Sequence, residues 1–206
     1  MMELMMSNKS KDKKKKKVEV QQVPEGVAPP GFYQYQAGLI VLAGEFNDEN
    51  IMPIIKSIYE YNMMPEDVKP DGITLIINSP GGTISSCLHL IDAMKTSALP
   101  VTTIGQGMVA SCGILTLMAG DRRLATHNTS MMSHQFAAGS SGKEHELLAR
   151  AEHFKTTAEV LLQHYKKCTG KSKRYILKNL LTTTDIWLTA EECVEHGIID
   201  DVVVTY

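Results

Sequence analysis

The sequence predicts an α/β domain with a mainly parallel sheet, over about residues 31–206. Short apolar runs of strand length alternate with longer segments in which apolar residues recur at helical spacing. This alternation is typical of parallel strands joined by crossover helices. Small residues and glycines follow the second and third runs. Because functional groups gather beyond the carboxyl ends of parallel strands, these two turns are the first places to search for a site.

Residues 1–30 differ from the rest of the chain in charge and patterning. Residues 1–17 carry seven lysines against Glu3 and Asp12, a local charge of +5, which leaves −7 for the remainder because the net charge is −2. We expect residues 1–30 to be a disordered tail and arm. Docking or nucleic-acid binding by the lysine run is the alternative, although the acidic remainder does not resemble a nucleic-acid binder.

Composition narrows the class of protein. The chain has 206 residues, 43% of them hydrophobic, which is enough for one domain with a substantial core. No apolar run reaches the ~20 residues of a membrane span, so we expect no membrane association. The four cysteines form no C-x-x-C pair, which argues against a zinc site and against a disulfide framework; they are Cys87, Cys112, Cys168 and Cys193. A reducing cytoplasm is the simplest location, and no metal is expected.

The first half of the domain reads as strand, helix, strand, helix. Apolar residues 38–44 and 72–78 predict two buried strands. Asn47 or Asp48 can cap the helix between them, and Pro53 is expected in its first turn and no deeper. A tight turn containing Gly81 and Gly82 then leads into a helix over about residues 83–96.

A third strand, residues 100–104, is expected to end at Gly105, and Ser111 lies where strand gives way to the next helix. Free N–H groups and the positive end of the helix dipole stabilise an oxyanion at such a position. The alternative is that the serine only caps the helix, since serine is a favoured N-cap.

The second half predicts short strands over residues 122–125 and 130–133, then a long helix over about residues 143–168. Ser141 and Glu144 have capping-box spacing before this helix. Its apolar stripe fits either the core or an oligomer contact, and its members are Leu147, Ala151, Phe154, Ala158, Leu161 and Tyr165. A helix over residues 172–180, an irregular connector over 182–188, a helix capped by Thr189 and Glu192, and a strand over 198–204 complete the domain.

Ser111 is a useful nucleophile only if a base accepts its proton, and histidine is the usual base. Of the two histidines near strand ends, His134 is better placed than His127 because it precedes a glycine- and serine-rich loop. The other five fall in predicted helices: His89, His145, His153, His164 and His196. Asp185 is one of many acids that could orient the base.

Other catalytic patterns fail or are weaker. Val109 occupies the position where a G-x-S-x-G elbow needs glycine, and the chain has no phosphate-binding loop and no H-E-x-x-H zinc motif. Cys112 is an alternative nucleophile, but its backbone N–H is expected to matter more than its sulfur.

Several segments together resemble the Clp protease proteolytic subunit (ClpP) family, in the family's order and near its spacing over about residues 37–204. They are Asn78-Ser79-Pro80-Gly81-Gly82, Gly107-x-x-Ala110-Ser111-x-Gly113, Asn128-x-x-x-Met132-x-His134-Gln135, Asp185-x-Trp187-Leu188-Thr189-Ala190-x-Glu192 and Gly197-Ile198-Ile199-Asp200. The resemblance implies a ClpP/crotonase-like spiral of β-β-α units with a long protruding handle helix. It also implies Ser111 as nucleophile, His134 as base and Asp185 as the orienting acid, with the N–H groups of Gly82 and Cys112 as the oxyanion hole.

By the same resemblance the chain forms a homo-oligomer of two stacked heptameric rings around a chamber that degrades unfolded polypeptides. A AAA+ unfoldase of the Hsp100 type feeds the chamber and uses ATP, so no cofactor is expected on this chain. Two other functions stay open: a catalytically silent ring or scaffold subunit, and a crotonase-type acyl-CoA enzyme. Retention of Ser111, His134 and Asp185 argues against the crotonase-type enzyme, which would not need them.

Overall fold

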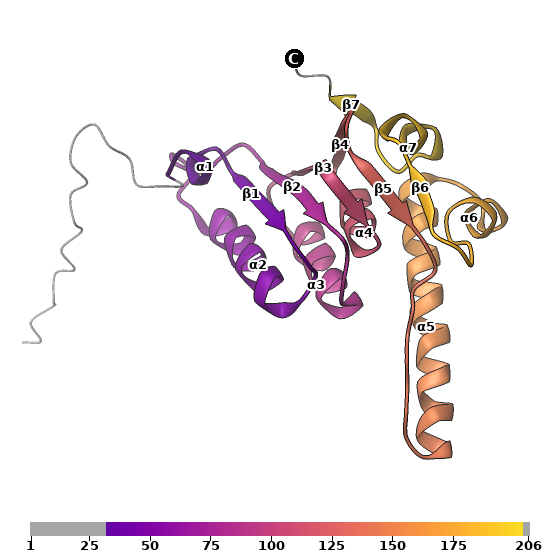
Figure 1. The fold of residues 1–206 in the computed structure, drawn as a ribbon. Helices are drawn as coiled ribbons and strands as arrows, with labels where there is room; N and C mark the ends of the chain where they lie inside the picture. Colours follow the sequence, from indigo (N-terminus) through magenta and orange to yellow (C-terminus); the bar gives the residue numbers. More distant parts are fainter. Residues whose placement is uncertain (1–31, 204–206) are drawn as a thin grey trace, which may run out of the picture. The chain divides into compact units, whose positions relative to one another are not determined.

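A seven-stranded sheet forms the centre of the computed structural model, which describes residues 32–203 (Figure 1). The lysine-rich tail expected over residues 1–30 lies outside the described residues. Five strands follow the order β1-β2-β3-β4-β7, and all pairs along this path are parallel. The strands are β1 Leu39–Ala43, β2 Ile73–Ser79, β3 Val101–Ala110, β4 Arg122–Thr126, β5 Ser130–Ser133, β6 Ile186–Leu188 and β7 Asp201–Val203. The predicted α/β class is confirmed.

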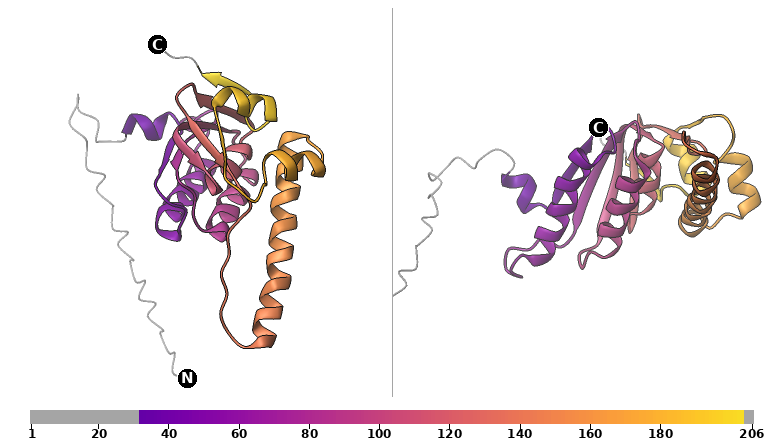
Figure 2. Two further views of the ribbon diagram at one scale, coloured as in Figure 1. Left: turned by 45° about the vertical axis from the view of Figure 1, so that its right-hand side comes forward. Right: turned by 90° about the horizontal axis from the view of Figure 1, so that it is seen from below.

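Helices α2, α3 and α4 lie along one side of the sheet (Figure 2). The helices of the described region are α1 Phe32–Gln36, α2 Asp48–Met63, α3 Ile84–Lys95, α4 Cys112–Met118, α5 Glu144–Thr169, α6 Lys173–Asn179 and α7 Ala190–His196. Alternate residues of β1 and β2, such as Leu42 and Leu75, are buried in the core. Their neighbours face the other way, and Val41 on the edge strand is 51% exposed, so β1 is buried on one face only.

Strand β3 is longer than the sequence predicts and changes partner along its length. Its first half pairs with β4 and its second half with β5, while β2 follows its other side through a register shift. The strand passes through Gly105 and Gly107 and reaches Ala110, so the expected end at Gly105 is wrong. Gly107 has a φ of +68°, which glycine adopts without the cost of a Cβ. The glycines mark an irregularity within the strand and not its end.

The structure also corrects three predictions about where helices and strands begin or end. Asn47 caps α2 by accepting a hydrogen bond from the N–H of Asn50 at 2.9 Å, so Pro53 lies inside the helix and beyond its first turn. At the start of α5 the Glu146 carboxylate accepts the N–H of Lys143 at 3.1 Å, so the box expected at Ser141 does not form the cap. The final strand is confined to Asp201–Val203 in the described region, shorter than the predicted residues 198–204.

The expected connector over residues 182–188 ends in a strand. Residues 186–188 form β6, which pairs antiparallel with β5. Ser133 lies opposite Ile186 and Met131 opposite Leu188 in this register. The capping box expected from Thr189 and Glu192 is confirmed at the start of α7. Pairing β6 with β5 brings the residues just beyond Ser133 and just before Ile186 to the same edge.

Helix α5 has 26 residues, and only Leu161, Leu162 and Tyr165 within it are buried. Its first turns run beside the segment that follows β5 and extend past α2 and α3 (Figure 1). Leu147 and Leu148 in these turns are 39% and 63% exposed. The predicted apolar stripe therefore enters the core only in its second half. No helix within residues 32–203 has the length and apolar content needed to cross a membrane.

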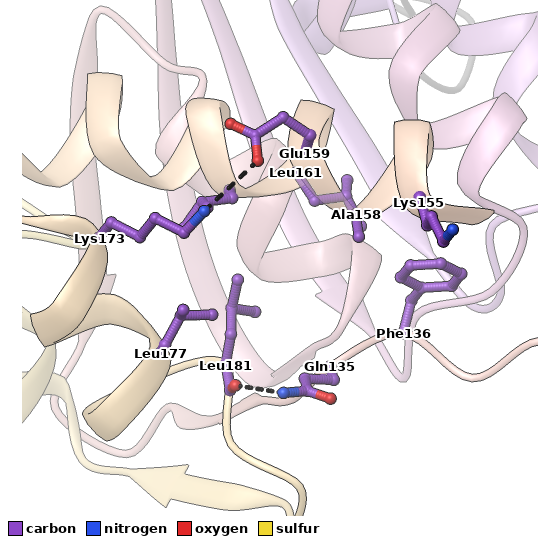
Figure 3. A pocket seen from close by; sticks show the side chains of 10 residues that line it. Gln135, Phe136, Lys155, Ala158, Glu159, Leu161, Lys173, Leu177 and Leu181 are labelled. Carbon is purple, nitrogen blue, oxygen red and sulfur yellow. Dashed lines mark hydrogen bonds and ion pairs between the residues drawn. The ribbon is translucent and has the colours of Figure 1, made fainter. Parts of the chain in front are cut away.

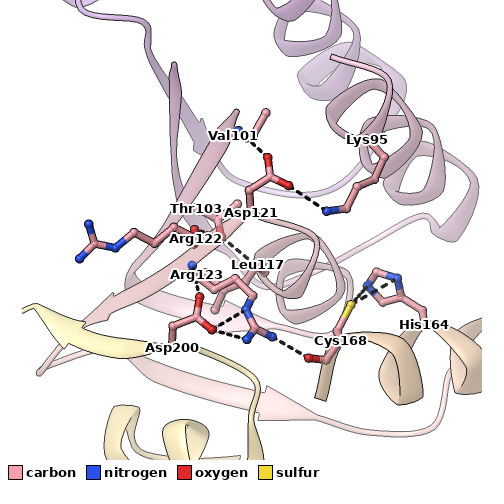
Figure 4. Close-up of polar contacts among 10 residues, drawn as sticks. All are labelled: Lys95, Val101, Thr103, Leu117, Asp121, Arg122, Arg123, His164, Cys168 and Asp200. Atoms are coloured by element: carbon pink, nitrogen blue, oxygen red, sulfur yellow. Dashed lines mark hydrogen bonds and ion pairs between the residues drawn. The ribbon is translucent and has the colours of Figure 1, made fainter. Parts of the chain in front are cut away.

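Arg123 on β4 joins the carboxyl-terminal elements to the sheet (Figure 4). Its guanidinium donates to the Asp200 carboxylate, to the Cys168 carbonyl at 2.8 Å and to the Gly197 carbonyl at 3.0 Å. Its backbone N–H also donates to Asp200 at 2.8 Å. One side chain thus contacts the ends of α5 and α7 and the start of β7.

Candidate active site

Ser111 lies between β3 and α4 in a strained backbone conformation. Its φ of +54° and ψ of −114° make it the one non-glycine residue with positive φ in the described region. Such strain persists only where surrounding structure fixes it, and it is frequent at functional sites. The N–H of Ser111 donates to the Met132 carbonyl at 2.9 Å, and its hydroxyl makes no capping bond to α4. The serine therefore occupies the N-cap position without using its side chain as a cap.

The Ser111 hydroxyl faces His134 instead. Nε2 of His134 lies 2.8 Å from Oγ of Ser111, and Nδ1 lies 3.5 Å from Oδ1 of Asp185. A carboxylate beside Nδ1 favours the tautomer with the proton on that nitrogen, which leaves Nε2 free to accept the serine proton. The structure thus brings together the three side chains that the sequence singled out. The His134 side chain is 24% exposed and Asp185 is 56% exposed, so the acid faces solvent.

The glycine turn after β2 packs directly against Ser111. A Cβ on Gly81, whose φ is +101°, would lie 2.7 Å from the Ser111 Cβ. A Cβ on Gly82 would lie 2.5 Å from the carbonyl oxygen of Phe46. Phe46 holds the turn through its backbone, because its N–H donates to Gly81 at 2.8 Å and its carbonyl accepts from Thr83 at 2.7 Å. The two turns that follow β2 and β3 therefore meet at Ser111.

Within the described residues, the N–H groups of Gly82 and Cys112 donate to no protein acceptor. Cys112 follows Ser111 at the start of α4, and Gly82 follows Gly81, which packs against Ser111. Free backbone donors beside a hydroxyl can bind the oxyanion that develops on a carbonyl oxygen when the hydroxyl attacks the carbonyl carbon. The Cys112 thiol donates to the Gly82 carbonyl at 3.2 Å, so the two donor residues also contact each other.

Cys112 does not occupy the place of a nucleophile. It is 1% exposed, and the histidine contacts Ser111. A hydrogen bond from Cys87 is the main cause that lowers the pKa of the Cys112 thiol, while burial opposes it. The thiol lies close to the site because of its sequence position, but it is buried and donates to the Gly82 carbonyl, whereas His134 contacts the Ser111 hydroxyl.

Open space adjoins the site on two sides. A cavity of about 20 Å³ is lined by Ser111, Cys112 and His134 together with apolar side chains that include Phe136. Phe136 also borders a groove of about 350 Å³ between α5 and α6 (Figure 3) and another of about 510 Å³ that reaches Gly82. Phe136 borders all three spaces, so apolar surface continues from the cavity at Ser111 into both grooves.

The other sequence candidates lie elsewhere. His127 sits in the β4–β5 turn, where Nδ1 lies 2.8 Å from Oε1 of Glu191. The five remaining histidines are in helices, as expected. Among residues 32–203, no three His, Cys, Asp or Glu side chains are grouped so that they could hold a metal ion.

Comparison with known proteins places these features in a family. The model of the Clp protease family matches residues 33–206. The chain belongs to the Clp protease family. It is also 33% identical over 168 residues to an ATP-dependent Clp protease proteolytic subunit of Pleurastrum terricola, which covers 81% of this chain and 83% of that protein. The family assignment expected from the ordered motifs is confirmed.

In this Clp protease family member, sequence reasoning missed the residues that support the site. No sequence pattern points to Phe46, because its contribution to the turn is two backbone hydrogen bonds that any residue type except proline could make. Gly81 was noted only as part of a turn, whereas the geometry requires glycine at this position. A Gly-Gly pair directly after a buried strand was the only signal available for either residue.

Proposed function

We propose that this protein is a serine endopeptidase in which residues 31–206 form the peptidase domain. Ser111 is the nucleophile, His134 the general base and acid, and Asp185 the group that orients the histidine. The observation that carries the proposal is the 2.8 Å contact between Nε2 of His134 and the hydroxyl of a strained serine. Family membership supports the choice of peptide bonds as substrate.

The proposed reaction follows from this geometry. Ser111 Oγ attacks the peptide carbonyl while its proton passes to Nε2 of His134. The oxyanion accepts hydrogen bonds from the N–H groups of Gly82 and Cys112, and Asp185 stabilises the imidazolium. His134 then protonates the leaving amine, which leaves an ester on Ser111. Water, deprotonated by the same histidine, hydrolyses the ester and restores the serine.

The setting is proposed from the family. A relative is named as a proteolytic subunit that depends on ATP. We propose that this chain forms two stacked heptameric rings in the cytoplasm and degrades polypeptides fed by an Hsp100-type AAA+ unfoldase. The unfoldase is then the subunit that hydrolyses ATP, and this chain needs no cofactor. The exposed apolar residues of α5 support an oligomer, since Leu148 on that helix is 63% exposed in the described part of the chain.

Ser111→Ala tests the assignment. Cleavage of an unfolded fluorescent polypeptide should fall by about 10³-fold or more, because the variant lacks the oxygen atom that attacks the peptide carbonyl. A fluorophosphonate probe should label the wild type at Ser111 and leave the variant unlabelled, with the native mass unchanged. Unlabelled wild-type protein of correct mass would favour the catalytically silent ring subunit. A wild-type rate in Ser111→Ala would refute the nucleophile.

A further inference from the structure

The carboxylate of Asp185 is held only weakly by its contact with His134. Asp185 is 56% exposed, and its carboxylate makes one contact, at 3.5 Å, within the described residues. The β5–β6 register places residue 134 opposite residue 185, one step beyond the last pair, Ser133 and Ile186. Register alone leaves residues 180–185 free to move away, so other contacts must hold this segment.

Both neighbours of His134 in the sequence donate hydrogen bonds to that segment. The Ser133 hydroxyl donates to the Leu180 carbonyl at 2.8 Å. The Gln135 side-chain amide donates to the Leu181 carbonyl at 2.9 Å (Figure 3), and its backbone N–H donates to Thr182 at 3.4 Å. The residues on either side of the base are thereby bonded to three successive carbonyls that lead to the acid.

Tyr165 of α5 completes the network. Its hydroxyl lies 2.7 Å from the Ser133 Oγ, and both side chains are buried. The Ser133 proton is used on the Leu180 carbonyl, so the Tyr165 hydroxyl must be the donor to Ser133. Burial raises the pKa of the Tyr165 phenol well above its usual value, which keeps this donor protonated. The hydrogen bonds therefore run in one direction, from α5 through β5 to the segment before Asp185.

We propose that Ser133, Gln135 and Tyr165 are positioning residues that hold Asp185 opposite His134. The side-chain hydrogen bonds of the three residues reach neither Ser111 and His134 nor Gly82 and Cys112. Their effect on the rate passes through the acid, because their bonds end on the carbonyls of residues 180–182. This inference rests on the proposed serine mechanism and adds to it the means by which the acid is placed.

The test is a double-mutant cycle with Asp185→Ala. Gln135→Met keeps the side-chain length but removes the amide donor, and Tyr165→Phe removes only the hydroxyl. In the wild-type background each should lower kcat by about 3- to 10-fold with KM changed less than about twofold. In the Asp185→Ala background each should lower kcat by less than about 1.5-fold. Rates of fluorophosphonate labelling at Ser111 should follow the same pattern.

Two controls keep the result interpretable. Gln163→Met removes an exposed amide whose hydrogen bond, within residues 32–203, goes to Glu159 on the same helix, and it should leave kcat unchanged in both backgrounds. Gln135→Asn retains a donor and should recover part of the loss in Gln135→Met. Ser133→Ala is avoided as the main variant, since it leaves a buried carbonyl and the Tyr165 hydroxyl unpaired.

The outcomes separate this inference from the proposed function. Equal losses in both backgrounds, with wild-type Ser111 reactive toward the probe, would overturn the positioning role and leave the serine mechanism intact. No loss for either variant in the wild-type background would overturn it too. Wild-type protein whose Ser111 does not react would overturn both the proposed function and this inference.

Discussion

The two ends of the proposed triad are held in different ways. Ser111 lies between β3 and α4, and its surroundings are core: Gly81 packs against it, and its N–H is bonded to β5. Asp185 lies on a segment at the surface, 56% exposed, and is placed by hydrogen bonds from neighbouring side chains. Close packing tolerates almost no change of volume, whereas a hydrogen-bonded segment can shift. The nucleophile should therefore be sensitive to steric change and the acid to loss of individual donors.

The largest expected effect comes from adding one methyl group beside the nucleophile. In Gly81→Ala the Cβ would lie 2.7 Å from that of Ser111, in a backbone conformation with φ of +101°. Serine or the turn must move, so polypeptide cleavage should fall by about 10³-fold. Gly139→Ala is the matched control, because a Cβ there meets nothing within 4 Å. Activity in Gly81→Ala equal to that of the control would mean that packing does not fix the nucleophile.

A smaller loss is expected at the other end of the triad. Asp185→Ala removes a carboxylate that is 3.5 Å from the imidazole and partly screened by solvent. We expect kcat to fall by about 10²-fold, less than for Ser111→Ala, as measured by cleavage and by probe labelling. Asp71→Ala, at another exposed carboxylate, should have no effect. If Asp185→Ala were as damaging as Ser111→Ala, the acid would have to be held as rigidly as the serine.

The third prediction concerns stability away from the site. Burial alone would raise the pKa of the Asp200 carboxyl, but hydrogen bonds from Arg123 outweigh burial and lower the pKa. A lowered folded-state pKa gives stability that is full above about pH 4 and is lost as pH falls through the folded value. Asp200→Asn should therefore lower Tm by about 2–4 °C at pH 7.

This difference in Tm from the wild type should begin to shrink below about pH 4, where the carboxyl of the unfolded chain takes up a proton, and it should vanish below the lowered folded-state pKa, where the folded carboxyl is protonated as well. Asp67→Asn, at an exposed acid, serves as the control. A constant difference from pH 7 to pH 3 would show that the Arg123 contact acts through packing and not through charge. Cleavage by Asp200→Asn at 25 °C should stay within about twofold of the wild type, since the ion pair is remote from Ser111.

The sequence was most informative where local pattern decides structure. Caps such as Thr189 and the alternation of strands and helices are encoded within a few residues, and both were predicted. Residue type and position favour Ser111 and His134, whereas Asp185 is one of many acids until the family resemblance selects it. The structure brings the three side chains together. Their catalytic roles stay a proposal.

Features that depend on distant pairing were missed. Strand β6 has three residues, and its partner β5 lies far away along the chain, so the sequence shows no alternating pattern that would predict this strand. Gly105 predicted a strand end because glycine is unfavourable in strands. However, β3 pairs first with β4 and then with β5, and this pairing extends the strand to Ala110. The bonds from Ser133 and Gln135 likewise depend on where residues 180–182 fold back, which single-sequence reasoning does not provide.

The uneven burial of α5 has a consequence for amide hydrogen exchange. Its last turns are anchored by Leu161, Leu162 and Tyr165, whereas its first turns carry exposed Leu147 and Leu148. Amides in thinly covered turns open at little free-energy cost and exchange quickly, while anchored turns exchange only on larger unfolding. A steep gradient of protection along this one helix is expected for an isolated chain. Flattening of that gradient would give a residue-level measure of how much of α5 is covered by another molecule in solution.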